Sequence, residues 1–263
     1  MGITSYFKRP KVTRLALKVW QRNWDVLRKT FKVSLIPPFL EPLLYLFALG
    51  FGLGFFVGQI GGIPYPAFIA PALISISVMN TAFFETTYGS FVRMYYQKTF
   101  DAITATPLNL DEVITGELLW GATRSLINGA IILFVVTAFG LVQMPVGLLI
   151  LPFAFLGGFL FATIGMIFTA ISPNIDSLNY PTFLFITPMF LFSGTFFPIS
   201  ILPNTVQTFA FAALPLAHLV SIARSITLNS LTLFNSYNLA WIIVISAILA
   251  IVSINLMKKR LIE

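Results

Sequence analysis

The sequence predicts an all-α membrane protein with six transmembrane helices. Three observations support this prediction: an apolar composition, six long apolar stretches, and basic residues concentrated near both ends of the chain. Of the 263 residues, 57% are hydrophobic and 10% are charged, whereas about 25% of residues are charged in a typical soluble domain. So few charges cannot cover the surface of a soluble protein of this length. The composition therefore excludes a soluble enzyme and a disordered binding protein.

The apolar stretches set the number of membrane crossings. A hydrocarbon core of about 30 Å requires about 20 mostly apolar residues in a helix. The run Thr205–Leu214 is shorter and is flanked by prolines, so residues 199–224 are expected to form a re-entrant segment before the last span. The six stretches that meet the length requirement are Val33–Val57, Tyr65–Tyr88, Val113–Val142, Val146–Ser172, Leu178–Pro198 and Tyr237–Met257.

The basic residues set the expected orientation, because Lys and Arg are enriched in cytoplasmic loops. Nine of the 16 basic residues precede Val33, and three more are Lys258, Lys259 and Arg260. If both ends are cytoplasmic, the number of spans is even, and the loop after the second span also lies inside. This arrangement places 14 of the 16 basic residues in the cytoplasm. The sequence therefore predicts a multi-pass protein of the cell (inner or plasma) membrane with both termini cytoplasmic.

Residues 1–32 are expected to form a cytoplasmic basic arm with an amphipathic connector helix, and residues 33–263 a transmembrane domain. One face of the connector carries basic residues, and the other is an apolar stripe at spacings of three and four. Such a helix lies among anionic lipid headgroups. It serves either as a general anchor or as a connector to a partner protein, and nucleic acid is not expected as a partner. The stripe consists of Leu17, Trp20, Trp24, Leu27 and Phe31.

Four charged residues fall inside or beside the expected spans: Glu41, Glu85, Glu117 and Arg124. A charge at the centre of a bilayer costs about 2.5–3.5 kcal/mol on translocon scales, so each requires a partner or a function. Glu117 and Arg124 are seven residues apart and share one helical face. A structural or gating role in ion pairs is favoured. A proton or ion relay, which would indicate a proton-coupled secondary transporter, is the alternative.

Other motifs exclude several kinds of site. Gly50, Gly54 and Gly58 have the spacing that allows close helix packing. No G-x-x-x-x-G-K-[ST] motif occurs, so the chain has no phosphate-binding loop for ATP. There is no cysteine, and His218, expected at the outer interface, is the only histidine, so no metal site and no catalytic residues are expected. A lipid-modifying enzyme is therefore a distant third possibility.

The loop of residues 89–111 joins the second and third expected spans and is too polar to cross a membrane. Pro107 ends its helical part, because the residue before a proline is displaced from the helical region. Asp111 is expected to be the N-cap of the next span. A short helix across the cytoplasmic mouth of the bundle is a suitable contact for a soluble partner.

Five stretches of this sequence resemble the permease subunit of type-2 ABC exporters. The most specific are E-T-T-Y-G-S-F-V-R-M-x-x-Q-K-T-F-D-A-x-x-A-T-P-L (residues 85–108) and G-E-L-L-W-G-A-T-R (residues 116–124). Residues 40–54 resemble the first span of that family, and residues 192–198 and 215–218 resemble the stretch between its last two spans. Within the family, the sequence is most similar to the nodulation-factor exporter permeases (NodJ) and the anthracycline-resistance permeases.

The resemblance implies a homodimer of this permease with two copies of a separate ABC ATPase, which would bind ATP and magnesium. This chain would hold no cofactor and catalyse no reaction. The cargo would be amphiphilic: a lipid-linked saccharide, a lipo-oligosaccharide or a hydrophobic drug. The loop would contain the coupling helix that docks on the ATPase, and its expected contact residues are Arg93, Met94, Gln97, Lys98, Thr99, Phe100 and Asp101.

Overall fold

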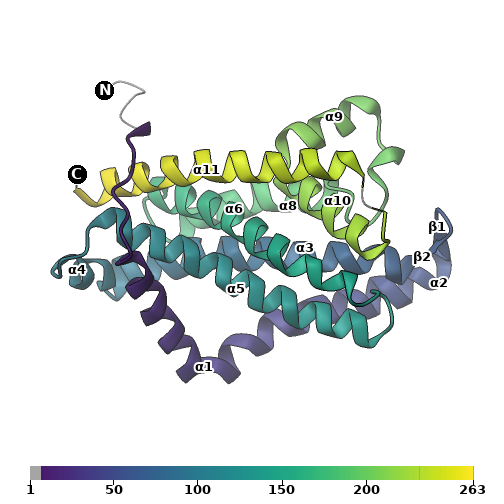
Figure 1. Ribbon diagram of the computed structural model, residues 1–263, viewed down its shortest axis with the longest axis horizontal. Coiled ribbons are helices and arrows are strands. Elements are labelled where there is room, and N and C mark those ends of the chain that lie inside the picture. The colour runs from purple at the N-terminus through teal and green to yellow at the C-terminus, as the bar shows by residue number, and fades with distance from the viewer. Residues whose placement is uncertain (1–6, 231, 263) are drawn as a thin grey trace.

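The computed structural model describes residues 7–230 and 232–262, apart from the side chains of residues 32–35 and 37–39. It is an elongated helical bundle with one small hairpin of strands β1 (Gln59–Ile60) and β2 (Ile63–Pro64) (Figure 1). The predicted all-α class is thus confirmed. The helices are α1 (Ala16–Tyr45), α2 (Gly54–Val57), α3 (Tyr65–Phe84), α4 (Thr99–Thr104), α5 (Leu110–Ala138), α6 (Ile150–Ile171), α7 (Asn179–Pro181), α8 (Thr187–Phe192), α9 (Asn204–Ala213), α10 (Pro215–Thr227) and α11 (Leu233–Ile262).

Five helical segments of the described residues are long and apolar enough to cross a membrane. Wider π-helical turns join α1 to α2 and extend α3 as far as Tyr96. The helices α9 and α10 bend by 95° at Leu214 and form either a sixth, broken span or a re-entrant loop. The five segments are Leu40–Val57, Tyr65–Tyr96, Leu110–Ala138, Val146–Ile171 and Leu233–Ile262.

The fifth expected span, Leu178–Pro198, differs from the structure. The helical run there extends from Asp176 to Phe192, which at about 1.5 Å per residue covers about 26 Å and is shorter than a bilayer core of about 30 Å. Residues 193–198 are not helical. The prediction of a longer span rested on apolar composition, which remains high up to Pro198 and gives no information about where the helix ends.

Helix α1 contains both the connector and the start of the first span, with a break in helical geometry at Thr30 (φ −109°, ψ 15°). In Figure 1 it runs away from the N-terminal end, bends sharply and continues along the bundle. The side of the connector that faces the protein is formed by Ala16, Val19, Asn23 and Leu27, all buried. Of the expected apolar stripe, Leu17 and Phe31 stay exposed, and such exposure suits a helix that contacts lipid.

Helix α3 is the centre of the bundle and packs against α5, α6 and α10. In its span, 78% of the most apolar window is buried, compared with 22% for Leu40–Val57 and for Leu233–Ile262. Glycines allow the central helices to approach closely: a Cβ added at Gly158 of α6 would lie 2.6 Å from Ser125 Cβ of α5. The first and last spans therefore present apolar sides to lipid or to another protein.

Both described ends of the chain lie at one end of the bundle (Figure 1). Asp111 at the start of α5 accepts a hydrogen bond from the Lys11 backbone N–H (2.9 Å) and pairs with Lys258 Nζ of α11 (2.9 Å). We call this the basic end. Asp111 is therefore not the N-cap of α5, as was expected. The N-cap is Asn109, whose side chain accepts from the Glu112 N–H while Glu112 accepts from the Asn109 N–H.

Candidate functional site

Four charged side chains form a compact group between α3 and α5, which we call the charge cluster: Glu85, Arg93, Glu117 and Arg124. Arg93 Nη1 lies 2.8 Å from Glu85 Oε1, and Arg93 Nε donates to Glu117 Oε2 at 2.8 Å. Arg124 Nε lies 3.7 Å from Glu85 Oε2. The side chain of Glu117 is fully buried, and the other three are 13–15% exposed. The cluster has two positive and two negative charges, so it is neutral as a whole.

Uncharged side chains also donate hydrogen bonds to the two carboxylates. Trp120 Nε1 donates to Glu85 Oε1 (3.0 Å), and Ser90 Oγ donates to Glu117 Oε2 (3.0 Å). Asn23 Nδ2 of the connector donates to Glu117 Oε1 (2.9 Å). The cluster therefore joins three elements that are far apart in the sequence: the connector, the end of the α3 span, and α5.

The local backbone explains how Glu85 and Arg93 come together. They are eight residues apart on α3 and its extension, where π-helical turns at Glu85–Gly89 and Val92–Tyr96 widen the helix. Such turns occur often at functional sites. Sequence reasoning found Glu117 and Arg124 on one face of α5, but it placed Arg93 in the docking loop. In the structure, the Arg93 side chain lies inside the bundle, where it forms ion pairs with both Glu85 and Glu117.

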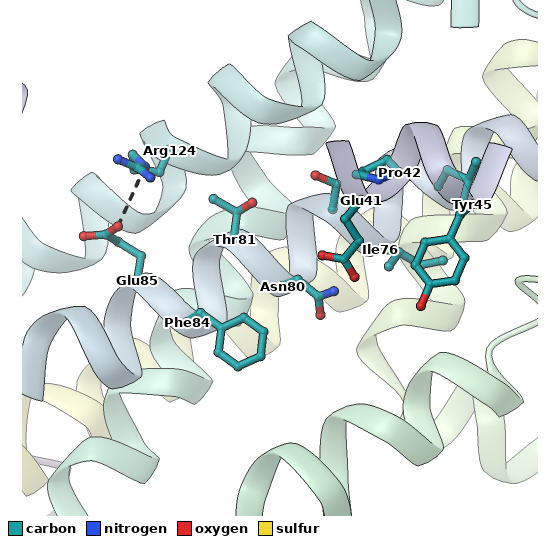
Figure 2. A pocket seen from close by; sticks show the side chains of 11 residues that line it. Glu41, Pro42, Tyr45, Ile76, Asn80, Thr81, Phe84, Glu85 and Arg124 are labelled. Carbon is teal, nitrogen blue, oxygen red and sulfur yellow. Dashed lines mark ion pairs between the residues drawn. The ribbon is translucent and has the colours of Figure 1, made fainter. Parts of the chain in front are cut away.

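A cavity of about 330 Å³ lies beside the cluster, between α1, α3 and α5 (Figure 2). Its polar part contains Glu85 and Arg124, and Figure 2 shows their ion pair at one end. The other part is mixed: apolar and aromatic side chains such as Ile76 and Tyr45 lie there together with Glu41 and Asn80. Ligand-binding cavities are usually about 300–1,000 Å³, mostly apolar, with a few polar groups that fix orientation. The complete lining is Glu41, Pro42, Tyr45, Leu73, Ile76, Ser77, Asn80, Thr81, Phe84, Glu85 and Arg124.

Glu41 does not join the charge cluster. It lies on α1, on the far side of the cavity, and its carboxylate points toward Asn80 (Figure 2). Its side chain is exposed. The structure thus separates the four charged residues expected from the sequence into a cluster that contains three of them and a fourth at the cavity wall.

A second cavity, of about 450 Å³, lies between the connector and the extension of α3. Glu85 and Arg124 line both cavities, so the charge cluster stands between them. The connector contributes Arg22 to the second cavity. Burial lowers the pKa of the Arg22 guanidinium, and the charge of Glu117 acts in the opposite direction.

The loop at the basic end contains α4, which begins after Lys98 in a left-handed conformation (φ 51°). Phe100 is 1% exposed and anchors α4 to the bundle, and Met94 is also buried. Gln97, Lys98 and Asp101 are exposed. Of the seven expected docking residues, these three present side chains to the outside, Thr99 is half-buried, and Arg93, Met94 and Phe100 face inward.

The three glycines of the first span have different surroundings. A Cβ added at Gly50 would lie 3.0 Å from Leu46 and 3.6 Å from Ile69 of α3, and Gly54 lies against Tyr65. A Cβ added at Gly58 would meet no other atom within 4 Å in the described part of this chain, and the positive φ (69°) of Gly58 ends α2. This turn favours glycine, and packing of Gly58 against another helix stays a prediction.

Comparison with known proteins gives consistent results. Residues 15–228 match the family model described as ABC-2 type transporter. The chain is 41% identical to nodulation protein J of Rhizobium leguminosarum bv. trifolii, and 38% identical to nodulation protein J of Sinorhizobium fredii, over 81% of each chain in both comparisons. It is 25% identical to the inner membrane transport permease YadH of Escherichia coli, over 72% of this chain and 74% of that protein.

No solved structure matches the chain. The family match covers most of the sequence, including the α3 extension, α4 and the charge cluster. The two nodulation proteins match it over 213 residues, so the similarity is not restricted to one motif. This multi-pass membrane protein belongs to the ABC-2 type transporter family.

Proposed function

We propose that the chain is the permease subunit of an ATP-driven exporter that moves an amphiphilic molecule out of the cytoplasm or the inner leaflet. Two copies would assemble with two copies of an ABC ATPase, which holds ATP and magnesium. The observation that carries the proposal is the exposed α4 at the basic end, directly linked to the charge cluster through the α3 extension. A lipid-linked saccharide, a lipo-oligosaccharide or a hydrophobic drug is the proposed cargo.

The cavity beside the cluster supports an amphiphilic cargo. The Glu85–Arg124 pair at one end, and the apolar side chains of Leu73 and Ile76 farther along α3 beside Glu41, suit a molecule that has both polar groups and an apolar part. The cavity lies along the first span, whose most apolar window is only 22% buried. A lipid-like molecule in the bilayer therefore has a short path to it.

The α4 contact supports a mechanism for energy transfer. A partner that presses on α4 would move the α3 extension, because Phe100 fixes α4 to the bundle and Arg93 fixes the extension to α5. Movement there would separate the cluster and connect the two cavities. The cluster is thus the proposed gate, and Gln97, Lys98 and Asp101 are the proposed docking residues.

The proton-coupled alternative is less well supported by this geometry. A proton relay requires carboxylates that exchange protons with water. Glu117 is fully buried and both of its oxygens accept hydrogen bonds from Arg93, Ser90 or Asn23. Glu85 is paired with Arg93 and receives a hydrogen bond from Trp120. The oxygens of both carboxylates are therefore occupied by donors from within the bundle.

Charge reversal on α4 tests the proposal. Asp101→Lys should reduce permease-stimulated ATP hydrolysis by at least about tenfold while leaving membrane insertion and unfolding temperature unchanged, since Asp101 is exposed. The measurement uses the permease purified together with its ATPase in lipid nanodiscs.

The matched control is Asp176→Lys, an exposed acidic residue in the loop after α6, at the same end of the bundle. It should leave stimulation intact. If both variants stimulate ATP hydrolysis to the same extent, docking at α4 is contradicted. Transport by the permease alone on a proton gradient would favour the alternative.

A further inference from the structure

Arg224 on α10 lies at the end of the bundle opposite the basic end, and its partners are all uncharged. Its Nη2 donates to the Gly194 carbonyl oxygen at 2.9 Å, and its Cζ lies 3.8 Å from the centre of the Phe68 ring. No carboxylate among the described residues pairs with it. The sequence explains why: no Asp or Glu occurs from residue 42 to 84, or from 177 to 262.

A cavity of about 260 Å³ adjoins Arg224. Two buried polar atoms of its lining have no hydrogen-bond partner within the described part of the chain: Arg224 Nε and Ser193 Oγ. Ser193 is only 1% exposed, so its hydroxyl lies inside the protein. Ser221 and Ser225 also line the cavity. The cavity wall therefore contains the Arg224 guanidinium, which has no counter-charge, and the Ser193 hydroxyl, which has no hydrogen-bond acceptor.

Burial of a charge without a counter-charge, and of a hydroxyl without a partner, is unfavourable unless a ligand compensates both. An oxyanion does so: one oxygen accepts from Arg224 Nε and another from the Ser193 hydroxyl. A neutral sugar would satisfy the hydroxyl but leave the charge. Phe68, Phe211 and Ile199 form the rest of the wall, so an apolar chain attached to the oxyanion also has a place to bind.

We propose that this cavity, the Arg224 pocket, binds the oxyanion of an amphiphile, such as a phosphate, sulfate or carboxylate headgroup. This inference goes beyond the export role, because binding requires neither ATP nor a partner subunit. The same chemistry has two sources, a lipid-like molecule and a free inorganic anion. The experiment separates them.

The test measures equilibrium binding to the full-length permease alone, purified in dodecyl maltoside. The probes are phosphatidylglycerol, the matching diacylglycerol, which has the same chains without the anion, and inorganic phosphate. We expect phosphatidylglycerol to bind and diacylglycerol to bind at least about tenfold more weakly, because charge-assisted hydrogen bonds to the anion are lost. If phosphate binds as tightly as phosphatidylglycerol, the pocket is supported and a free anion is its ligand.

Three variants locate the binding in the pocket. Arg224→Gln should weaken phosphatidylglycerol binding at least about tenfold, and Ser193→Ala and Arg224→Lys about fivefold, since each removes one donor to a charged group. Lys98→Gln, the loss of an exposed positive charge in the loop before α4, should have no effect. Without the anion, Ser193→Ala should unfold no earlier than the unmodified chain, because it removes an unsatisfied buried hydroxyl.

Unchanged affinity in Ser193→Ala and Arg224→Lys would overturn the proposal, as would equal binding of diacylglycerol. These two variants decide the question even if Arg224→Gln does not fold. ATP hydrolysis does not enter the measurement, so a negative result here leaves the proposed export role intact.

Discussion

Arg93 holds two carboxylates from two different helices in a part of the molecule that water hardly reaches. Glu117 is fully buried, and its position is tolerable only because Arg93, Ser90 and Asn23 all donate to it. Removal of one member of a buried ion pair leaves the other without compensation. The stability of this region therefore depends on the complete set of residues.

The first prediction concerns Arg93→Gln. It should lower the free energy of unfolding by about 3–5 kcal/mol, because it leaves Glu117 charged and without its main partner. The double variant Arg93→Gln, Glu117→Gln should recover part of the loss, since both groups are then neutral. Unfolding of the detergent-solubilised chain measures both. Lys98→Gln, at an exposed ion pair with Asp101, is the control and should change little. If Arg93→Gln lowers the free energy of unfolding no more than Lys98→Gln does, the Arg93–Glu117 pair does not stabilise the fold.

The sequence predicted the positions of some side chains of the charge cluster but not of others. Glu117 and Arg124 could be placed on one face of α5 from their spacing alone, because both belong to one regular helix. Arg93 could not, because its partners come from two helices and the π-helical turns change its direction. His218, which was expected at the outer interface, is buried and stacks on Trp241 at 4.1 Å between ring centres, a contact that was not predicted. Single-sequence patterns do not reveal such partners from distant elements.

At the scale of single elements, the connector is joined to α5 by close contact rather than by charge. A Cβ added at Gly116 would lie 2.6 Å from Val19 Cβ and 2.7 Å from the Ala16 carbonyl oxygen. Trp20 Nε1 also donates to Thr123 Oγ1 of α5 at 2.9 Å. The connector therefore moves with α5, and through Asn23 it moves with the charge cluster.

The second prediction follows from this contact. Gly116→Val should displace the connector, lower the stability by about 1–3 kcal/mol as other overpacked substitutions do, and expose the arm to limited proteolysis. The control is Gly52→Val, where an added Cβ meets only a backbone oxygen of its own helix at 3.5 Å. Equal proteolysis of both variants would show that the connector is not held at Gly116.

The amphipathic pattern of the connector and the apolar spans could be predicted because periodicity and length are local properties. The break at Thr30 could not, since no proline or glycine lies within five residues of it. The end of the fifth span had a local signal that apolar composition does not use: Gly194, with a positive φ of 72°, follows Phe192 by two residues. The sequence also located the proposed docking residues only approximately. The pattern identified α4, but burial of Phe100 and Met94 depends on the bundle beneath them.

At the scale of the whole molecule, the charges divide the bundle into two different ends. The basic end gathers both described ends of the chain, α4 and most of the acidic residues, whereas the opposite end contains Arg224 and no carboxylate from residues 177–262. This asymmetry predicts that the basic end faces the cytoplasm.

The third prediction tests this orientation. The chain has no cysteine, so single cysteines report one site each. A membrane-impermeant maleimide added to intact spheroplasts should label Ser230→Cys, at the end opposite the basic end. It should label Asp176→Cys, in the loop after α6, only after the membrane is opened. The reverse pattern would place the basic end outside and contradict the proposed site for the ATPase.

The central claim is that a separate ATPase drives this permease through α4. The most direct test is a photoactivatable amino acid at position 101, irradiated in native membranes, with the same residue at position 176 as the control. We predict that position 101 forms a cross-link to a protein with an ATP-binding phosphate loop, that the yield changes when ATP is added, and that position 176 gives much less. A permease that forms no such cross-link, and that purifies alone while transporting on a proton gradient, would contradict the claim.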